Sequence, residues 1–277
     1  MVRGALRAWC AEGVVRGALR VWRWTGAVTA GCVVGDLFDD GMMTSALIVA
    51  AGSSRRMGFD KLAAPLAGCS VLERAVRALA GSGEFGEVIL VMGRDRWDEV
   101  CGWVAVVAAE MQVPVRWAPG GAERSDSVAS GLAAMSPEAV LVAVHDGARP
   151  LVSAVDVRRV VAAARVSGAA ALAHPVVETV KRADAAGCVT GSVEREGLWA
   201  METPQVFQTS WLREASAAAR ARGENPTDDV TVVQAAGCPV QLVASTTPNL
   251  KITHAQDLAL AASLLSIHGE AADPPRS

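Results

Sequence analysis

Several positively charged residues lie in a short loop at residues 51–61, directly after an apolar run. Residues 45–50 form an apolar run of strand length, and the small residues AGSS at 51–54 follow it directly. Small residues let a backbone turn tightly against a ligand. Arg55, Arg56 and Lys61 come next, with only Asp60 to balance them. Fixed cations beside loop amides predict a site for phosphate groups.

Two further loops carry polar residues behind predicted strands. PGGAERSDS at 119–127, whose glycines should free backbone amides, follows a predicted strand at 113–117, and HDGARP at 145–150 follows one at 140–144. Asp146 is a candidate Mg²⁺ ligand because magnesium prefers one or two carboxylates together with phosphate oxygens. Its alternative role is to cap the following turn. The first loop contains neither GxxxxGK[ST] nor GxGxxG, so a P-loop and a dinucleotide-binding fingerprint are excluded.

The elements that position these loops alternate between strands and helices. Apolar runs and helical spacing predict strands at 45–50, 87–92, 113–117, 140–144, 169–174, 198–207 and 240–244, and helices at 71–79, 94–110, 125–135, 155–166, 210–222, 228–236 and 254–267. Ser153 and Thr227 are the predicted N-caps of two of these helices. This alternation indicates an α/β fold, a single Rossmann-like domain with a mostly parallel, doubly wound sheet. The loops after residues 50, 117 and 144 should therefore line one crevice at the carboxyl ends of the strands.

One segment breaks this alternation. Residues 176–183 and 188–194 alternate between apolar and polar side chains on either side of a turn, which predicts an inserted hairpin. A two-stranded hairpin is only marginally stable alone. We therefore expect this β-arm, residues 176–195, to pack on a second subunit and the protein to be a homodimer.

The ends of the chain follow a different pattern. Residues 1–43 contain five arginines before an apolar patch at 26–34. A secretory signal would need a clean cleavage site and an organelle transit peptide would need serines, and this segment offers neither. We favour an N-terminal extension, disordered or upstream of a true start at Met42 or Met43. It precedes a catalytic domain at 44–268 and a tail at 269–277 that should fray.

Composition limits the partners of the protein. With 277 residues, 51% of them hydrophobic, the chain can bury a sizeable core. A net charge of −3 gives no general attraction to nucleic acid or to an anionic membrane, so we expect neither as a partner. Six scattered cysteines without a CxxC pair are typical of reduced thiols, which predicts a cytoplasmic protein without disulfides or structural zinc.

Seven motifs together resemble a known family. In chain order they read LIVAAGSSRRMGFDK, GGAERSDSV, VHDGARP, ETVKRAD, VEREGLW, TPQVF and NLKIT, and the resemblance covers roughly residues 45–265. Their order and intervals resemble the 2-C-methyl-D-erythritol 4-phosphate cytidylyltransferases of the non-mevalonate isoprenoid pathway. The resemblance implies attack of the acceptor phosphate on the α-phosphorus of CTP, with pyrophosphate leaving. A cytidylyltransferase for another polyol phosphate, such as ribitol 5-phosphate, is the alternative, and a catalytically dead nucleotide-binding protein is a more distant one.

The resemblance also implies roles for particular residues. The catalytic cations that stabilise charge at the α-phosphate are Arg56, Lys61 and Lys251. The nucleotide-binding residues are Ala50, Ala51, Gly52, Gly120, Gly121, Ser127 and Asp146. The acceptor-binding residues are Asp146, Arg149 and, from the β-arm of a second subunit, Thr179 and Arg195. Asp146 is also the implied Mg²⁺ ligand.

Two positions depart from the family pattern. Phe59-Asp60-Lys61-Leu62 stands where Pro-Lys-Gln is common, so we expect Asp60 to offset part of the charge of Lys61. Ala122 replaces a common Asp after the Gly-Gly pair, which changes little if the backbone contacts the base.

Overall fold

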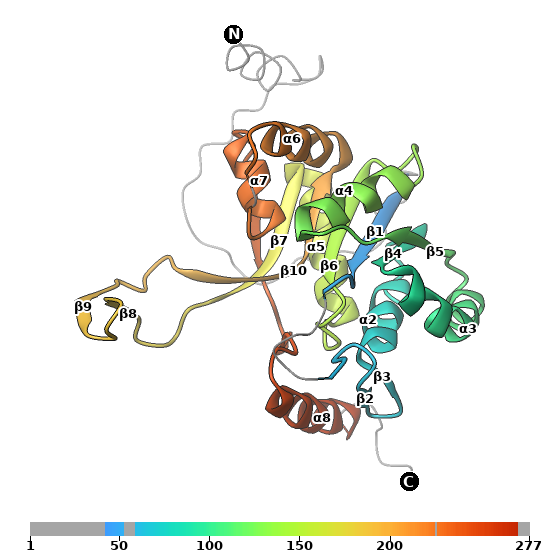
Figure 1. Ribbon diagram of the computed structural model, residues 1–277, viewed down its shortest axis with the longest axis horizontal. Coiled ribbons are helices and arrows are strands. Elements are labelled where there is room, and N and C mark those ends of the chain that lie inside the picture. Colours follow the sequence, from blue (N-terminus) through green and yellow to red (C-terminus); the bar gives the residue numbers. More distant parts are fainter. Residues whose placement is uncertain (1–41, 53–58, 225, 271–277) are drawn as a thin grey trace, which may run out of the picture.

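A seven-stranded sheet forms the centre of the computed structural model, which describes residues 42–52, 59–224 and 226–270 (Figure 1). Its strands are β1 (Thr44–Val49), β4 (Glu87–Met92), β5 (Val115–Pro119), β6 (Leu141–Asp146), β7 (Ala169–Pro175), β10 (Trp199–Gln208) and β11 (Gln241–Ala244). They lie in the order β11-β7-β10-β6-β1-β4-β5. β10 runs antiparallel to both of its neighbours, and the other pairs are parallel. The predicted mostly parallel sheet is confirmed.

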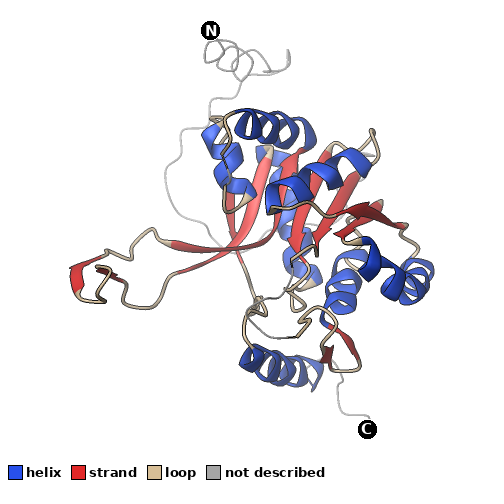
Figure 2. Ribbon diagram, viewed as in Figure 1, coloured by secondary structure: helices blue, strands red, loops and turns tan. Residues whose placement is uncertain are grey.

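Helices cover both faces of this sheet (Figure 2). One face packs against α2 (Val71–Ala80), α3 (Arg94–Met111) and α5 (Ala154–Ser167). α8 (Ala255–Glu270) contributes to the same core from a position beside residues 65–66, away from the sheet. The other face packs against α4 (Arg124–Ala134), α6 (Thr209–Ala221) and α7 (Asp229–Ala235). A sheet covered on both faces is doubly wound, as predicted.

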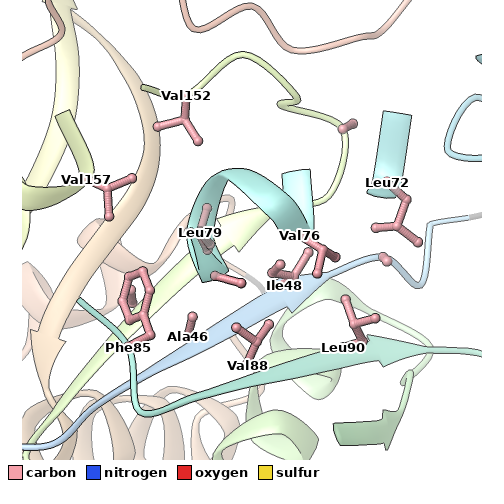
Figure 3. Close-up of a cluster of buried hydrophobic side chains, with 14 of the residues drawn as sticks. Ala46, Ile48, Leu72, Val76, Leu79, Phe85, Val88, Leu90, Val152 and Val157 are labelled. Carbon is pink, nitrogen blue, oxygen red and sulfur yellow. The ribbon is translucent and has the colours of Figure 1, made fainter. Parts of the chain in front are cut away.

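The strand period explains the two cores. Successive side chains of a strand point to opposite faces of the sheet. In β1, Ala46 and Ile48 belong to the core beneath α2, whereas Leu47 belongs to the core beneath α4. Figure 3 shows the first of these cores, with Ile48 beside Val76 of α2. A continuous apolar run therefore supplies both layers from one strand.

Two helix starts test the predicted caps. The Ser153 hydroxyl accepts a hydrogen bond from the amide of Asp156 at 3.1 Å, so this predicted cap is confirmed. The prediction of Thr227 as a cap is wrong. Asp228 caps α7 instead, because its carboxylate accepts from the amide of Thr231 at 2.9 Å. This start makes Asp229 the first helical residue.

Two short hairpins lie outside the main sheet. β8 (Lys181–Ala183) and β9 (Val189–Ser192) pair antiparallel on a segment that projects away from the body of the protein (Figure 1). These strands are shorter than the two alternating runs in the sequence, and their register shifts after Arg182. β2 (Pro65–Leu66) and β3 (Cys69–Ser70) form a second hairpin that the sequence analysis does not predict.

The described part of the chain begins at Met42. Residues 1–41, most of the predicted extension, are outside the described residues. Met42 packs against the first core, and the carbonyl of Met43 accepts hydrogen bonds from the amides of Val140 and Leu141 at 2.9 and 3.4 Å. Across the ranges described, no helix combines the length and apolar character needed to span a bilayer.

Candidate active site

A cleft of about 370 Å³ opens where the strands β1, β5 and β6 end. β1 lies between β4 and β6, so the chain reverses its direction of winding here, which is where open α/β sheets bind ligands. Three of the loops that line the cleft are those that the sequence predicts to converge. A fourth segment brings Lys251 from the connection between β11 and α8. The lining residues are Val49, Ala50, Ala51, Gly52, Lys61, Leu62, Gly121, Ala122, Glu123, Arg124, Ser127, Asp146, Ala148 and Lys251.

Three cations surround the carboxylate of Asp146. Lys251 Nζ lies 2.7 Å from Asp146 Oδ2, Arg149 Nε lies 3.7 Å from the same oxygen, and Arg124 Nε lies 3.9 Å from Oδ1. Burial opposes ionisation of this carboxyl, but the neighbouring positive charges outweigh it and lower the pKa of Asp146 to about 2. Asp146 is therefore an anion at neutral pH, held among fixed positive charges.

A chain of hydrogen bonds fixes the backbone at Asp146. Its amide donates to Thr203 Oγ1 at 3.0 Å, and Thr203 Oγ1 lies 3.0 Å from His145 Nδ1. His145 Nε2 lies 3.1 Å from the carbonyl oxygen of Arg149, which can only accept. Because burial lowers the pKa of His145 to about 4, the ring is neutral and its one proton belongs on Nε2. The Thr203 hydroxyl then donates to Nδ1, and every polar group in this series of hydrogen bonds has a partner.

Arg124 is held by a buried acid. Its Nη2 lies 2.7 Å from Asp229 Oδ2. Burial raises the pKa of Asp229, and the guanidinium of Arg124 counteracts this effect. Gln205 of β10 accepts a hydrogen bond from the amide of Val230 at 3.2 Å and so ties α7 to the sheet. Asp229 and Thr203 are absent from the residues that the sequence analysis assigns to the site, although Thr203 and Gln205 both stand in the TPQVF motif.

Lys61 lines the cleft and is tied to the segment that carries Lys251. Its Nζ donates to the carbonyl oxygen of Ile252 at 2.9 Å, and the amide of Ile252 donates to the carbonyl of Ala148 at 2.8 Å. Lys61 and Lys251 are thereby joined through one short segment. The structure brings these two predicted catalytic cations to one cleft, whereas Arg56 lies outside the described residues.

Asp60 has an ion-pair partner that the sequence analysis does not predict. Asp60 Oδ2 lies 2.6 Å from Nη2 of Arg96, a residue in the first turn of α3. The carboxylate is therefore neutralised by Arg96, and its other oxygen accepts from the amide of Leu62 at 3.0 Å. The sequence could not indicate this pair because the two residues lie on elements separated by α2 and β4.

The Gly-Gly pair allows a close approach between two loops. A Cβ on Gly120 would lie 2.5 Å from Cβ of Ala51, and one on Gly121 would lie 2.2 Å from Cβ of Asp126. The amides of both glycines are already used, since Gly120 donates to the carbonyl of Met92 at 3.0 Å and Gly121 to Ser127 Oγ at 3.1 Å. The expectation that these glycines free their amides for a ligand is therefore wrong. The lack of a side chain at these two positions instead allows the neighbouring residues to approach closely.

Thr179 and Arg195 do not reach this cleft in their own chain. Both are exposed on the projecting segment that carries β8 and β9, and neither lines the cleft. Arg195 Nη1 donates to the carbonyl of Val177 at 2.5 Å, within the same segment.

The donor set of the cleft suits a cation that also binds phosphate. No group of three or more His, Cys, Asp or Glu side chains is placed to hold a metal in the parts of the chain that the structure describes. These described parts of the chain therefore do not supply a complete set of metal ligands by themselves. Asp146 fits Mg²⁺, which takes one or two carboxylates and fills its other positions with water and phosphate oxygens. Its Oδ1 has Arg124 at 3.9 Å, while Oδ2 is paired with Lys251.

A doubly wound sheet with cations gathered around one ionised carboxylate at its point of reversal defines an α/β enzyme of the phosphate-handling class. Comparisons with known proteins give the family. Residues 44–266 match the family described as 2-C-methyl-D-erythritol 4-phosphate cytidylyltransferase. The chain belongs to this family.

Individual relatives agree with this assignment. An enzyme of that name from Pelotomaculum thermopropionicum is 38% identical over 80% of this chain and 93% of its own length. One from Prochlorococcus marinus is 40% identical over 80% of this chain and 97% of its own. The crystal structure of the enzyme from Thermus thermophilus is 35% identical, covers 81% of this chain and 100% of its own, and superposes with a TM-score of 0.65.

Proposed function

We propose that the cleft carries out the reaction of its family, in which the cytidylyl group of CTP is transferred to 2-C-methyl-D-erythritol 4-phosphate. An oxygen of the acceptor phosphate attacks the α-phosphorus of CTP, the bond to the β-phosphate oxygen breaks, and pyrophosphate leaves. The products are CDP-methylerythritol and pyrophosphate. The observation that carries this proposal is the grouping of Lys61, Lys251 and Arg124 around one cleft.

The cations supply charge stabilisation at the reacting phosphate. Negative charge grows on the oxygens around the α-phosphorus during phosphoryl-type transfer, and catalysis depends mainly on positioning and neutralisation. We assign this task to Lys61 and Lys251, with Arg56 as the third cation. Lys251 is paired with Asp146 in the free protein, and a triphosphate would compete with that carboxylate for its ammonium group.

We assign nucleotide binding to the loops that follow β1 and β5. Ala50, Ala51 and Gly52 follow β1, and Gly120 and Gly121 bring a second loop against them. Ser127 is buried and braces the amide of Gly121, so its contribution to cytosine binding is to hold the loop in shape. Because the glycine amides are used internally, we assign base recognition to carbonyl groups of this loop and to the backbone of Ala122.

Asp146 would hold Mg²⁺ together with phosphate oxygens of CTP. The ion would neutralise triphosphate charge when bound. Asp146 itself remains ionised throughout the working pH range, since its pKa is about 2. Arg149 reaches from the same loop, and its Nη1 donates to the carbonyl of Asn249 at 2.7 Å, which ties the loop to the segment that carries Lys251.

The acceptor site would be completed by a second subunit. Thr179 and Arg195 are exposed on the β-arm and lie outside their own cleft. A homodimer in which each arm crosses to the neighbouring cleft would place both residues against the acceptor phosphate. We further propose that the protein works in the cytoplasm. The family assignment favours methylerythritol phosphate over ribitol 5-phosphate as the acceptor.

One assay tests the reaction. Pyrophosphate release is measured with CTP and 2-C-methyl-D-erythritol 4-phosphate, with ribitol 5-phosphate as the competing acceptor and ATP, GTP and UTP as competing nucleotides. Lys61→Ala should lower kcat by roughly 10²–10³-fold, as for removal of a group that stabilises transition-state charge. Arg222→Ala is the matched control, because Arg222 is an exposed cation paired with Glu224. No release with any pair of substrates would refute the proposal.

A mixing experiment tests the arm. Lys61→Ala and Arg195→Ala should each be inactive, since one damages the cleft and the other the crossing arm. If the arm acts across a dimer, exchanging subunits between the two variants forms mixed dimers with one intact site. Activity should then return. A mixture that stays inactive while light scattering shows dimers would contradict the crossing arm.

A further inference from the structure

Arg96 is a residue outside the cleft with a direct connection to it. Its guanidinium makes two contacts, to Asp60 Oδ2 at 2.6 Å through Nη2 and to the carbonyl oxygen of Ala50 at 3.3 Å through Nη1. Ala50 follows β1 and lines the cleft, and Asp60 precedes Lys61, which also lines it. Arg96 itself is absent from the cleft lining. One side chain on α3 therefore contacts both Ala50, directly after β1, and Asp60, directly before Lys61.

The ion pair between Arg96 and Asp60 is shielded from solvent more than a neighbouring ion pair on the same helix. Its side chain is 22% exposed and that of Asp60 is 32% exposed, so both charges are largely withdrawn from solvent. Arg94, two residues earlier on the same helix, is 63% exposed and pairs with Asp98 at 3.1 Å within the helix. A partly buried pair is screened by water and salt much less than an exposed one.

The charge of Asp60 needs such a partner. Its carboxylate is adjacent in sequence to Lys61, at the edge of a cleft that must accept a triphosphate. Without Arg96, that carboxylate would repel the triphosphate and attract the Lys61 ammonium away from the carbonyl of Ile252, where it lies at 2.9 Å. With Arg96 in place, Asp60 is free to order the loop through the amide of Leu62 at 3.0 Å without adding net negative charge.

We propose that Arg96 is a positioning residue that neutralises Asp60 and thereby keeps the Lys61 loop competent to bind CTP. Arg96 acts through Asp60 and Ala50 and does not touch the substrate. This inference rests on the proposed role of Lys61 in the reaction. It accounts for how a carboxylate is tolerated beside a catalytic lysine in this chain.

The experiment is a double-mutant cycle in the full-length protein. Arg96→Met keeps the apolar stem of the side chain and removes its charge, and Asp60→Asn removes the opposing charge while keeping the acceptor for Leu62. Arg96→Met alone should raise KM for CTP roughly tenfold through uncompensated repulsion, with KM for the acceptor unchanged. The double variant Arg96→Met with Asp60→Asn should return KM for CTP close to the wild-type value. Arg94→Met is the matched control and should leave both constants unchanged.

The possible results separate the explanations. If the double variant is no better than Arg96→Met, Arg96 works by contacting the nucleotide or by holding Ala50, and the inference is overturned. Equal effects of Arg96→Met and Arg94→Met would also overturn it. Should Arg96→Met fail to fold while the double variant folds with normal KM, the neutralising role is supported. Full turnover of Lys61→Ala in the same assay would instead refute the role of Lys61, which is a separate result.

Discussion

The buried imidazole of His145 predicts a specific loss of stability in acid. Burial lowers the pKa of His145 from 6.5 to about 4 in the folded protein. As the pH falls below 6.5, the unfolded chain therefore takes up a proton that the folded protein refuses, and acid favours unfolding. This destabilising contribution is nearly absent above pH 6.5 and grows until the pH reaches the folded pKa of about 4.

The size of the effect follows from the two pKa values. Between pH 7 and pH 5, the difference in proton uptake by this one ring should lower the free energy of unfolding by about 2 kcal/mol. The Asp146 carboxyl also loses stabilisation in acid, but its folded pKa of about 2 and its ordinary value of 3.8 place that loss below pH 3.8. The two contributions therefore fall in different pH windows, and pH 5 isolates the imidazole from Asp146.

Urea denaturation at pH 7 and pH 5 measures this contribution. His145→Gln replaces the ring with an amide that can donate and accept but does not titrate. The difference between wild type and His145→Gln in the free energy of unfolding should change by about 2 kcal/mol between the two pH values. Thr203→Val is the comparison, because it removes the hydroxyl between His145 and Asp146 and should cost about 1–3 kcal/mol already at pH 7. Wild type and His145→Gln losing stability in parallel would refute the reasoning.

Three other changes test the cleft and the fold. Gly121→Ala should raise KM for CTP and lower thermal stability, since the new Cβ would lie 2.2 Å from Cβ of Asp126; unchanged steady-state kinetics would show that the loop can give way. Asp229→Asn should weaken the hold on Arg124 at 2.7 Å and cost about 1–3 kcal/mol in urea denaturation, and an equally stable variant would contradict the pairing. A protein that begins at Met42 should fold and keep full kcat, because that residue packs on the core; an insoluble product would show that the preceding residues support the fold.

Much of the fold follows from local pattern. The strand at 87–92 is predicted with its observed bounds because residues 88–92 form the continuous apolar run that is typical of a fully buried strand. The start of α7 is misassigned because Thr227 and Asp228 are both good caps, and only the geometry of the turn selects the carboxylate. The hairpin at Pro65–Leu66 and Cys69–Ser70 escapes prediction because two-residue strands carry no period.

The sequence likewise predicts only part of the candidate site. The alternation of strands and helices predicts that the loops carrying Lys61 and Asp146 share a crevice, and the family resemblance adds Lys251. The structure places all three in the cleft lining. The groups that hold them, such as Thr203 and Arg96, come from a strand interior and a helix turn, and their partners are distant in sequence. Such contacts are set by tertiary packing, so no local pattern in a single sequence predicts them.

The geometry of the cleft depends on the number of residues that connect β11 to Ile252. Its amide and carbonyl connect Ala148 to Lys61, and the residue before it is Lys251. The connection to both loops is made by main-chain atoms, so these bonds do not depend on which side chain stands at position 252, provided that it is not proline. Inserting or deleting one residue between β11 and this segment would instead displace Lys251 relative to Asp146 and disrupt the hydrogen bond that Lys61 donates to the carbonyl of Ile252. The position of the Lys251 charge across the cleft thus depends on the number of residues in this connection.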